Sequence, residues 1–198
     1  MKKVIGIDFD DVLMDFTPGF LSFFSKRLGK TFLKEDVKVF HFWEIFGLSK
    51  EEAVAICEEY YLTEEHLKNP PLFGSKEALQ KLSNFSLQVV TARPSFTEVV
   101  TTSWAQHHFE NAIEKFHFTN AFKSDQAVSK GTLAKDLGMS YFVDDAPHNA
   151  LDVASKGILV FLVDTPWNKN MESHELIKRV TSWDEIVEHI LFLESAIG

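Results

Sequence analysis

The chain has 198 residues, a formal net charge of -9 at pH 7 and a hydrophobic fraction of 45%. Its length and apolar content allow one substantial core with a small appended unit, and they exclude a disordered chain. The negative charge argues against a surface for nucleic-acid polymers or anionic membranes, since both require basic patches, and no run approaches the roughly 20 apolar residues of a membrane span.

The first apolar run, residues 3–8, predicts a buried strand that ends in acidic residues. Asp8 interrupts this run too early for a secretory signal, so we expect a cytoplasmic protein. Asp8, Asp10 and Asp11 fall together at the strand end, where ligands of open α/β sheets gather. An acidic surface turn would explain this motif alone. Carboxylates so close repel one another, however, and a divalent cation such as Mg²⁺ relieves that repulsion.

Residues 16–72 differ from the rest of the chain, because they contain helix-like runs without a convincing strand. Ser49 opens a capping-box pattern, which predicts the start of a helix. We therefore expect a helical cap inserted after the first strand, between core segments 1–15 and 73–198. Cys57 lies in a mostly acidic stretch without an activating base, and we interpret it as a structural thiol.

The second predicted strand, residues 86–91, ends in the sequence Thr91, Ala92, Arg93 and Pro94. A hydroxyl group, a free backbone N–H and a cation in succession suit the oxygens of a phosphate group. Arg93 has two interpretations, a bidentate clamp on phosphate or a salt bridge to a neighbouring acid. The sequence leaves both open.

A short helix is predicted between Ser129 and Gly138, with the serine as its N-cap and the glycine as its stop. Lys130 follows the cap, so it falls at the helix N-terminus, near the acidic strand ends. Lys123 and Lys135 are the alternatives for a lysine that offsets the charge of a phosphate group. We favour Lys130 because it begins the helix.

A second acidic pair, Asp144 and Asp145, ends the apolar run of residues 140–144. Two strands that both end in acids can bring their carboxylates to one edge of a parallel sheet. The other expected core elements are strands near residues 116–119 and 158–163 and helices over residues 95–109 and 146–156. This alternation predicts an α/β protein with a Rossmann-like parallel sheet.

With these motifs in this order, the sequence resembles the haloacid dehalogenase superfamily, whose motifs are an Asp-x-Asp strand end, a Ser or Thr strand end, a lysine and a terminal acidic pair. More narrowly, the stretches from Asp8 to Phe16, from Thr91 to Pro94 and from Asp164 to Asn168 are similar to the cytosolic type 5′(3′)-deoxyribonucleotidases and their bacterial relatives. The similarity spans nearly the whole chain. One departure is the Ala-Arg after Thr91, where the well-studied nucleotidases carry a small polar residue.

The resemblance implies a Mg²⁺-dependent phosphomonoesterase that acts on a small phosphorylated metabolite, in particular a (deoxy)nucleoside 5′-monophosphate. It implies that Asp8 attacks phosphorus to form an aspartyl phosphate and that Asp10 serves as the acid and then the base. Thr91 and the N–H of Ala92 would bind phosphoryl oxygens, and Lys130 would offset negative charge.

The metal ligands implied by the resemblance are Asp8, the main-chain carbonyl of Asp10, and Asp144 with or without Asp145. This arrangement leaves coordination positions for water and phosphate.

Aromatic residues of the cap hold the pyrimidine base in the resembling family, and Phe42 and Trp43 are the candidates here. The alternative is that both rings pack in the core of the cap. The expected partner is a small phosphate ester rather than a nucleic-acid polymer or a membrane, and a homodimer is left open. Two other classes of protein compete, a receiver-like phosphoaspartate signalling module and a catalytically silent binding relative. The expected cap and the second acid of Asp-x-Asp argue against the signalling module.

Overall fold

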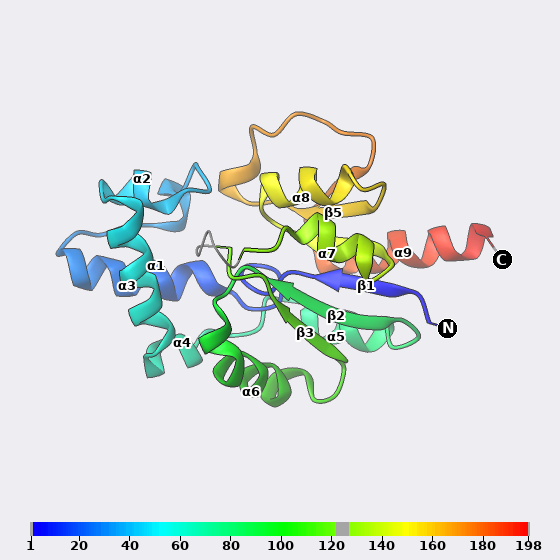
Figure 1. Cartoon of the computed structure of the whole chain (residues 1–198), viewed down its shortest axis with the longest axis horizontal. Helices are drawn as coiled ribbons and strands as arrows, with labels where there is room; N and C mark the ends of the chain where they lie inside the picture. Colours follow the sequence, from blue (N-terminus) through cyan, green and yellow to red (C-terminus); the bar gives the residue numbers. More distant parts are fainter. Residues whose placement is uncertain (1, 122–126, 198) are drawn as a thin grey trace.

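The computed structural model describes residues 2–121 and 127–197 and shows an α/β protein built on one parallel sheet (Figure 1). The strand order is β3-β2-β1-β4-β5-β6, and every neighbouring pair is parallel. The strands are β1 (Val4–Ile7), β2 (Ser86–Thr91), β3 (Lys115–Phe118), β4 (Met139–Asp144), β5 (Leu159–Val163) and β6 (Ile177–Val180). The strand order reverses between β1 and β4, and ligands of such sheets bind beyond the carboxyl ends at this switch point.

The predicted α/β class and its parallel sheet are confirmed, and each predicted strand is present with its ends shifted by a single residue at most. Strand β6 has no counterpart among the strands predicted from the sequence. In this strand only Val180 is fully buried, while Lys178 and Arg179 are exposed. A short edge strand with two charged residues gives little apolar signal.

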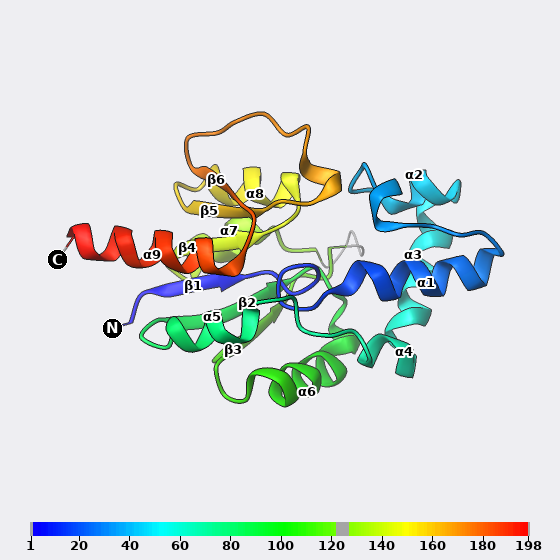
Figure 2. The same cartoon turned by 180° about the vertical axis from the view of Figure 1, so that it is seen from behind.

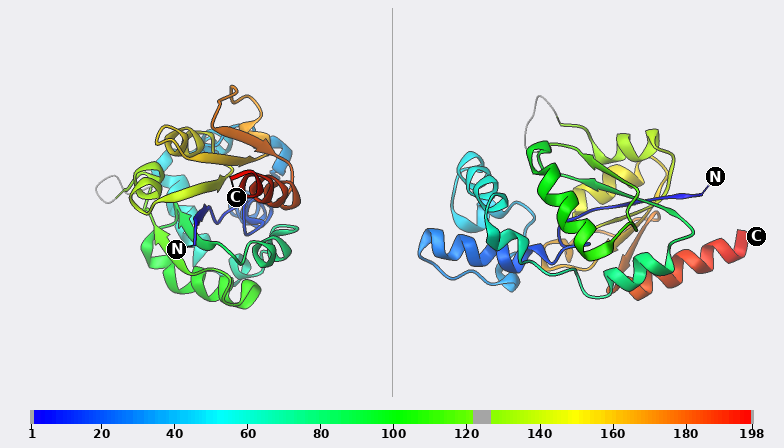
Figure 3. Two further views of the ribbon diagram at one scale, coloured as in Figure 1. Left: turned by 90° about the vertical axis from the view of Figure 1, so that its right-hand side faces the viewer. Right: turned by 90° about the horizontal axis from the view of Figure 1, so that it is seen from below.

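Helices cover both faces of the sheet (Figure 3). The first face carries α5 (Ser75–Lys81), α6 (Glu98–Phe109) and α9 (Trp183–Ile197), and the second carries α7 (Lys130–Asp136) and α8 (Pro147–Ala154). Successive strand residues alternate between the two layers: Tyr141 and Val143 pack on the first face, and Phe142 packs on the second. The helices expected over residues 95–109 and 146–156 correspond to α6 and α8.

A second group of helices lies beyond the carboxyl ends of the strands (Figures 1 and 2). It contains α1 (Phe16–Leu28), α2 (Phe42–Phe46), α3 (Lys50–Tyr61), α4 (Glu64–Leu67) and the 3-10 turn η1 (Lys34–Asp36). We call these elements and the chain between them the cap. Aromatic rings form its interior, and the ring centroids of Phe24 and Phe46 are 4.3 Å apart.

The helix start predicted at Ser49 is confirmed. The Glu52 N–H donates to Ser49 Oγ at 3.2 Å, and the Ser49 N–H donates to Glu52 Oε2 at 2.9 Å, so the capping box begins α3. Cys57 is buried, and burial raises the pKa of its thiol to about 12, which suits a structural cysteine.

The two chain segments that join the cap to the core pair with each other. The Asp15 N–H donates to the Pro70 carbonyl at 2.9 Å, and the Leu72 N–H donates to the Leu13 carbonyl at 2.8 Å. Both bonds lie near the ends of the predicted cap segment, residues 16–72; the division into cap and core stays a prediction. Within the described ranges, no helix combines the length and the apolar character needed to cross a membrane.

Candidate active site

The fold brings the ends of three neighbouring strands to one place. Asp8 follows β1 directly, Thr91 ends β2, and Asp144 ends β4. Because all three strands are parallel, their carboxyl ends lie at the same edge of the sheet. Asp8, Thr91 and Asp144 are all buried there, next to the cap.

Three carboxylates form a compact group at this edge. Asp8, Asp144 and Asp145 each offer one oxygen, and these oxygens lie within 4.8 Å of one another. Burial raises the pKa of Asp8 to about 7, opposed by the Lys130 ammonium and reinforced by Asp144. Burial also raises the pKa of Asp145 well above its usual range, and the charges of Asp144 and Asp8 add to this effect.

Lys130 is the cation of this group. Its Nζ lies 2.7 Å from Asp8 Oδ1 and 2.8 Å from Asp144 Oδ2, and the side chain is buried. Burial alone would lower the pKa of its ammonium group, but Asp144 and Asp8 outweigh burial and raise it. Ser129 caps the helix by accepting a hydrogen bond from the Thr132 N–H at 3.1 Å, so Lys130 is held at the first position of α7.

Of the two alternative lysines, Lys135 is exposed on α7, and Lys123 lies outside the described residues. Three carboxylates and one ammonium leave a formal charge of -2, three minus one. That charge and the all-oxygen donor set fit one hard divalent cation.

Thr91 and Ala92 lie beside the acids. Thr91 is fully buried, and its Oγ1 accepts the Arg93 N–H at 3.2 Å. Ala92 lines the cavity that contains Asp8. The end of β2 and the residue after it therefore place a hydroxyl group and backbone at the sheet edge that carries Asp8.

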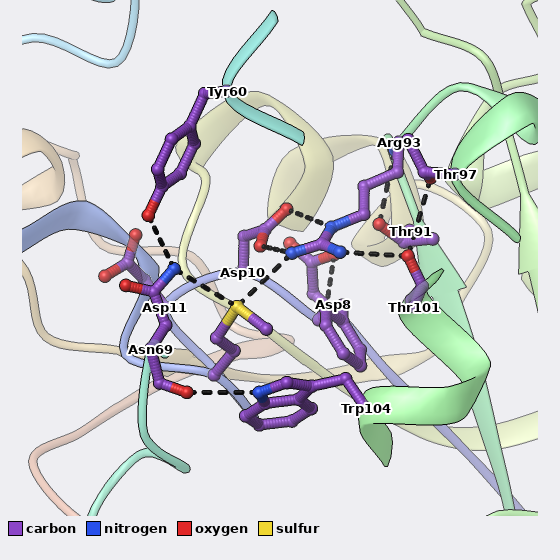
Figure 4. A network of polar contacts seen from close by, with 12 residues as sticks. Asp8, Asp10, Asp11, Tyr60, Asn69, Thr91, Arg93, Thr97, Thr101 and Trp104 are labelled. Atoms are coloured by element: carbon purple, nitrogen blue, oxygen red, sulfur yellow. Dashed lines mark hydrogen bonds and ion pairs between the residues drawn. The ribbon is translucent and has the colours of Figure 1, made fainter. Parts of the chain in front are cut away.

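Arg93 adopts the salt bridge, one of the two arrangements that the sequence left open (Figure 4). Its Nε donates to Asp10 Oδ2 at 3.0 Å and its Nη2 to Asp10 Oδ1 at 2.5 Å, while Nη1 donates to Thr101 Oγ1 at 2.9 Å. The side chain is fully buried, and it is absent from the lining of the cavity that holds Asp8. The guanidinium is bound to Asp10 in this structure, and contact of Arg93 with a phosphate stays a prediction.

The acids face a cavity of about 110 Å³ that continues into the cap. Asp8, Asp10, Asp11 and Asp145 line one part of it. Apolar and aromatic side chains of the cap and of the 3-10 turn Pro166–Asn168 line the other part: Phe16, Phe20, Leu21, Val37, Phe40, Phe42, Tyr61 and Trp167. A charged end and an aromatic end together suit a phosphate ester with a planar organic group.

The two predicted aromatic contacts lie in different places. Phe42 lines this cavity and also packs against Phe20, with ring centroids 5.2 Å apart. Trp43 instead lines a neighbouring cavity of about 470 Å³, where its ring stacks on His41 at 4.6 Å. The second cavity also contains Lys130, and it shares Phe40, Ala92 and Asn149 with the first.

Trp167, Asn168 and Asp11 lie around the acids, although none of them is assigned to the site from the sequence. Trp167 Nε1 donates to Asp145 Oδ2 at 2.8 Å, and Asn168 Nδ2 donates to the Asp145 carbonyl at 2.8 Å. Both lie in the stretch that resembles the nucleotidases, which was the available signal. Asp11 accepts hydrogen bonds from the N–H and the hydroxyl of Thr17 and has a positive φ of 56°, so it orders the turn after the first strand.

Comparison with known proteins agrees with this geometry. The sequence model of a family described as "5' nucleotidase, deoxy (Pyrimidine), cytosolic type C protein" matches residues 2–195. A Bacillus cereus protein named "Putative nucleotidase" is 28% identical over 196 residues, covering 91% of this chain and 94% of that protein. An Oceanobacillus iheyensis protein with the same description is 24% identical over 94% of this chain and 98% of its own length.

The fold also has a solved counterpart. A hydrolase of the haloacid dehalogenase-like family from Streptococcus pneumoniae matches with a TM-score of 0.71 and 16% identity. The match covers 96% of this chain and 98% of that one, so the two proteins share a fold.

Proposed function

The chain belongs to the cytosolic type C family of 5′ nucleotidases, within the haloacid dehalogenase superfamily, and is a hydrolase of phosphoric monoesters; from that premise we propose that it cleaves a (deoxy)nucleoside 5′-monophosphate through an aspartyl phosphate on Asp8. One observation carries the proposal: a buried carboxylate paired with Lys130 opens onto a cavity whose far end is aromatic. The family's cytosolic character supports a cytoplasmic location.

The proposed nucleophile has one oxygen already bound. Asp8 Oδ1 accepts the Phe9 N–H at 2.7 Å and lies 2.7 Å from Lys130 Nζ. Oδ2 has no hydrogen-bond partner in the part of the chain that the structure describes, so we assign it the attack on phosphorus. The Thr91 hydroxyl and the Ala92 N–H would bind phosphoryl oxygens, and Lys130 would offset the charge that gathers there.

The proposed proton donor is Asp10. It lines the cavity two residues after the nucleophile, and its side chain is 23% exposed. Asp10 would protonate the leaving oxygen as the ester bond breaks, and would then accept a proton from the water that hydrolyses the aspartyl phosphate. One difficult displacement thereby becomes two easier ones.

We propose Mg²⁺ as the cation, held by Asp8, the main-chain carbonyl of Asp10 and Asp144, with Asp145 beside it. When bound, it would supply positive charge to the phosphate and to Asp8. The support is the donor set itself, whose clustered carboxylates carry more negative charge than Lys130 balances.

We propose that Phe42 contacts the base, since its ring lines the cavity that contains Asp8. Phe16 lines the same cavity from the start of α1 and joins this proposal. Trp43 would contact only a leaving group that extends into the neighbouring cavity. The substrate is then a small ester, with its phosphate at the acids and its base among the rings of the cap.

The test is phosphate release from a panel of ribo- and deoxyribonucleoside monophosphates and small sugar phosphates, with Mg²⁺ and with a chelator. We expect metal-dependent turnover that is highest on deoxynucleotides, and we expect Asp8→Asn to lose several orders of magnitude of kcat with an unchanged circular dichroism spectrum. Asp136→Asn, an exposed change on α7, is the control. Turnover on sugar phosphates alone would show that the substrate is not a nucleotide. Full activity of Asp8→Asn would show that Asp8 is not the nucleophile.

A further inference from the structure

Arg93 is fully buried, and its guanidinium makes polar contacts with Asp10, Thr101 and Met14. A buried guanidinium is costly, and an ion pair inside a protein is often no more stabilising than apolar side chains of the same volume. Its partner Asp10 is also partly exposed to the cavity. The pair is therefore poorly explained by stability alone.

The guanidinium is fixed from both the core and the cap. Thr101, on α6 of the core, accepts the Nη1 hydrogen bond. The ring of Phe9 lies 4.5 Å from Arg93 Cζ, and the ring of Tyr61, on α3 of the cap, lies 4.9 Å from it. With contacts on several sides, the guanidinium group has little freedom to rotate. Its Nε and Nη2 donors therefore point in a fixed direction, toward Asp10.

The two donors fix the plane of the Asp10 carboxylate. Bidentate pairing uses one lone pair on each oxygen, and each oxygen keeps another for a proton. Asp10 must give a proton to the leaving oxygen and later take one from water, and both transfers depend on its orientation.

Resting on the proposed function, we propose that Arg93 is a positioning residue, which holds the Asp10 carboxyl group in place for proton transfer to the leaving oxygen. In that step the bond from Asp8 Oδ2 to phosphorus forms, the bond from phosphorus to the ester oxygen breaks, and the proton of the Asp10 carboxyl group moves to the departing oxygen. Arg93 acts through Asp10, because its guanidinium is bonded to the two oxygens of that carboxyl group.

The experiment compares two esters that need the proton differently. A nucleoside 5′-monophosphate has a poor alkoxide leaving group, whereas p-nitrophenyl phosphate releases a phenolate that leaves without protonation. The value of kcat/KM reports the steps up to phosphorylation of Asp8, so it isolates the departure of the leaving group. We expect Arg93→Met to lose roughly 10²-fold or more in kcat/KM on the nucleotide, as for the loss of general acid catalysis, and about tenfold at most on the nitrophenyl ester.

A double-mutant cycle separates positioning from direct binding. If Arg93 acts through Asp10, adding Arg93→Met to Asp10→Asn costs less than about threefold more on the nucleotide. If Arg93 bound phosphate directly, Arg93→Met would lower kcat/KM equally on both esters and would raise KM. The fall in kcat/KM would also persist when Asp10→Asn is present, and that result overturns the proposal. Arg27→Met, an exposed change in the cap, is the control and should leave both esters unchanged.

Thr101→Val provides a second route if Arg93→Met does not fold. It removes the hydrogen bond to Nη1 and leaves the ion pair in place. We expect a smaller fall in kcat/KM, again larger on the nucleotide than on the nitrophenyl ester. An equal fall on both esters would overturn the proposal. Turnover by the wild-type enzyme tests the proposed function separately, since its absence on every ester would remove that function, and this inference with it.

Discussion

His66, on α4 of the cap, is a buried side chain whose two ring nitrogens both lack a hydrogen-bond partner among the described residues. Its exposed fraction is 0%. The rings of Tyr60 and Tyr61 lie 5.5 Å and 5.4 Å from it. Burial lowers the pKa of His66 to about 3, and the charge of Arg93 adds to that effect. The folded protein therefore holds this histidine neutral.

We predict that His66 makes the fold acid-sensitive. An unfolded histidine titrates near pH 6.5, so between about pH 6.5 and pH 3 the unfolded state binds a proton that the folded state does not. The free energy of unfolding should fall as the pH falls through that window, by up to about 1.4 kcal/mol per pH unit. Urea unfolding of the wild type and of His66→Phe at a series of pH values measures this slope.

The His66→Phe variant should lose most of that slope, whereas His107→Gln, at an exposed position on α6, should keep it. Equal slopes in all three proteins would show that the histidine is protonated in the folded state or is not buried.

At the scale of single residues, the sequence predicts which groups gather but not how they pair. Asp8, Asp144 and Lys130 follow from strand ends and a helix start, because those positions are fixed by the backbone. Arg93 could not be settled in this way. Its long side chain can reach either a phosphate or Asp10, and the choice depends on Thr101 and on rings from distant segments.

At the scale of elements, the close approach of α7 to α8 fixes the position of Lys130. The Gly131 N–H donates to Asp152 Oδ2 at 2.6 Å, and a Cβ added at Gly131 would lie 2.6 Å from the Asp152 carbonyl oxygen. Because the Asp152 carbonyl belongs to the backbone and cannot rotate away, a side chain at position 131 would force α7 and α8 apart. Lys130, one residue earlier, would then move away from Asp8 and Asp144.

We predict that Gly131→Ala lowers the free energy of unfolding by about 1–3 kcal/mol, as for overpacking, and lowers kcat/KM by roughly tenfold or more. Thermal unfolding and the phosphate-release assay measure the two effects. Lys135→Ala, an exposed change on the same helix, should alter neither. Full activity of Gly131→Ala would mean that α7 can shift without moving the lysine.

Helix geometry also explains why Phe42 and Trp43, predicted to line the same site, line two different cavities. Phe42 and Trp43 are neighbours on α2, so their side chains point about 100° apart and cannot both face one small cavity. The sequence shows that the cap is rich in rings. It cannot show which ring faces the acids, because that depends on how α2 packs against α1.

At the scale of the whole molecule, Lys34 joins the cap to the core. Its Nζ lies 3.5 Å from Asp11 Oδ1 and 3.4 Å from Asp15 Oδ1, and it also lies 5.9 Å from the centroid of the Trp167 ring. Burial raises the pKa of Asp11 to about 6, and the Lys34 ammonium opposes that rise. This ion pair is partly buried and connects η1 to the segment that follows β1.

We predict that Lys34→Met loosens the cap, because it removes the cation from a buried carboxylate. The free energy of unfolding should fall by about 1–2 kcal/mol, and hydrogen exchange should quicken in η1 and in residues 166–168. Lys26→Met is the matched control, since its ion pair with Glu65 is exposed and lies within the cap. Unchanged exchange in Lys34→Met would show that apolar contacts alone hold the cap down.

The paired segments at the base of the cap have a further consequence for how such a protein can diversify. Residues 13–15 and 70–72 hydrogen-bond to each other. The helices between them therefore form one long loop whose two ends are held together at the core. Lengthening a closed loop costs little, since the entropy grows only with the logarithm of its length. Natural selection can therefore exchange one contiguous stretch to change which ester is accepted. The reacting groups, in contrast, are spread from Asp8 to Asp145 and are inherited together.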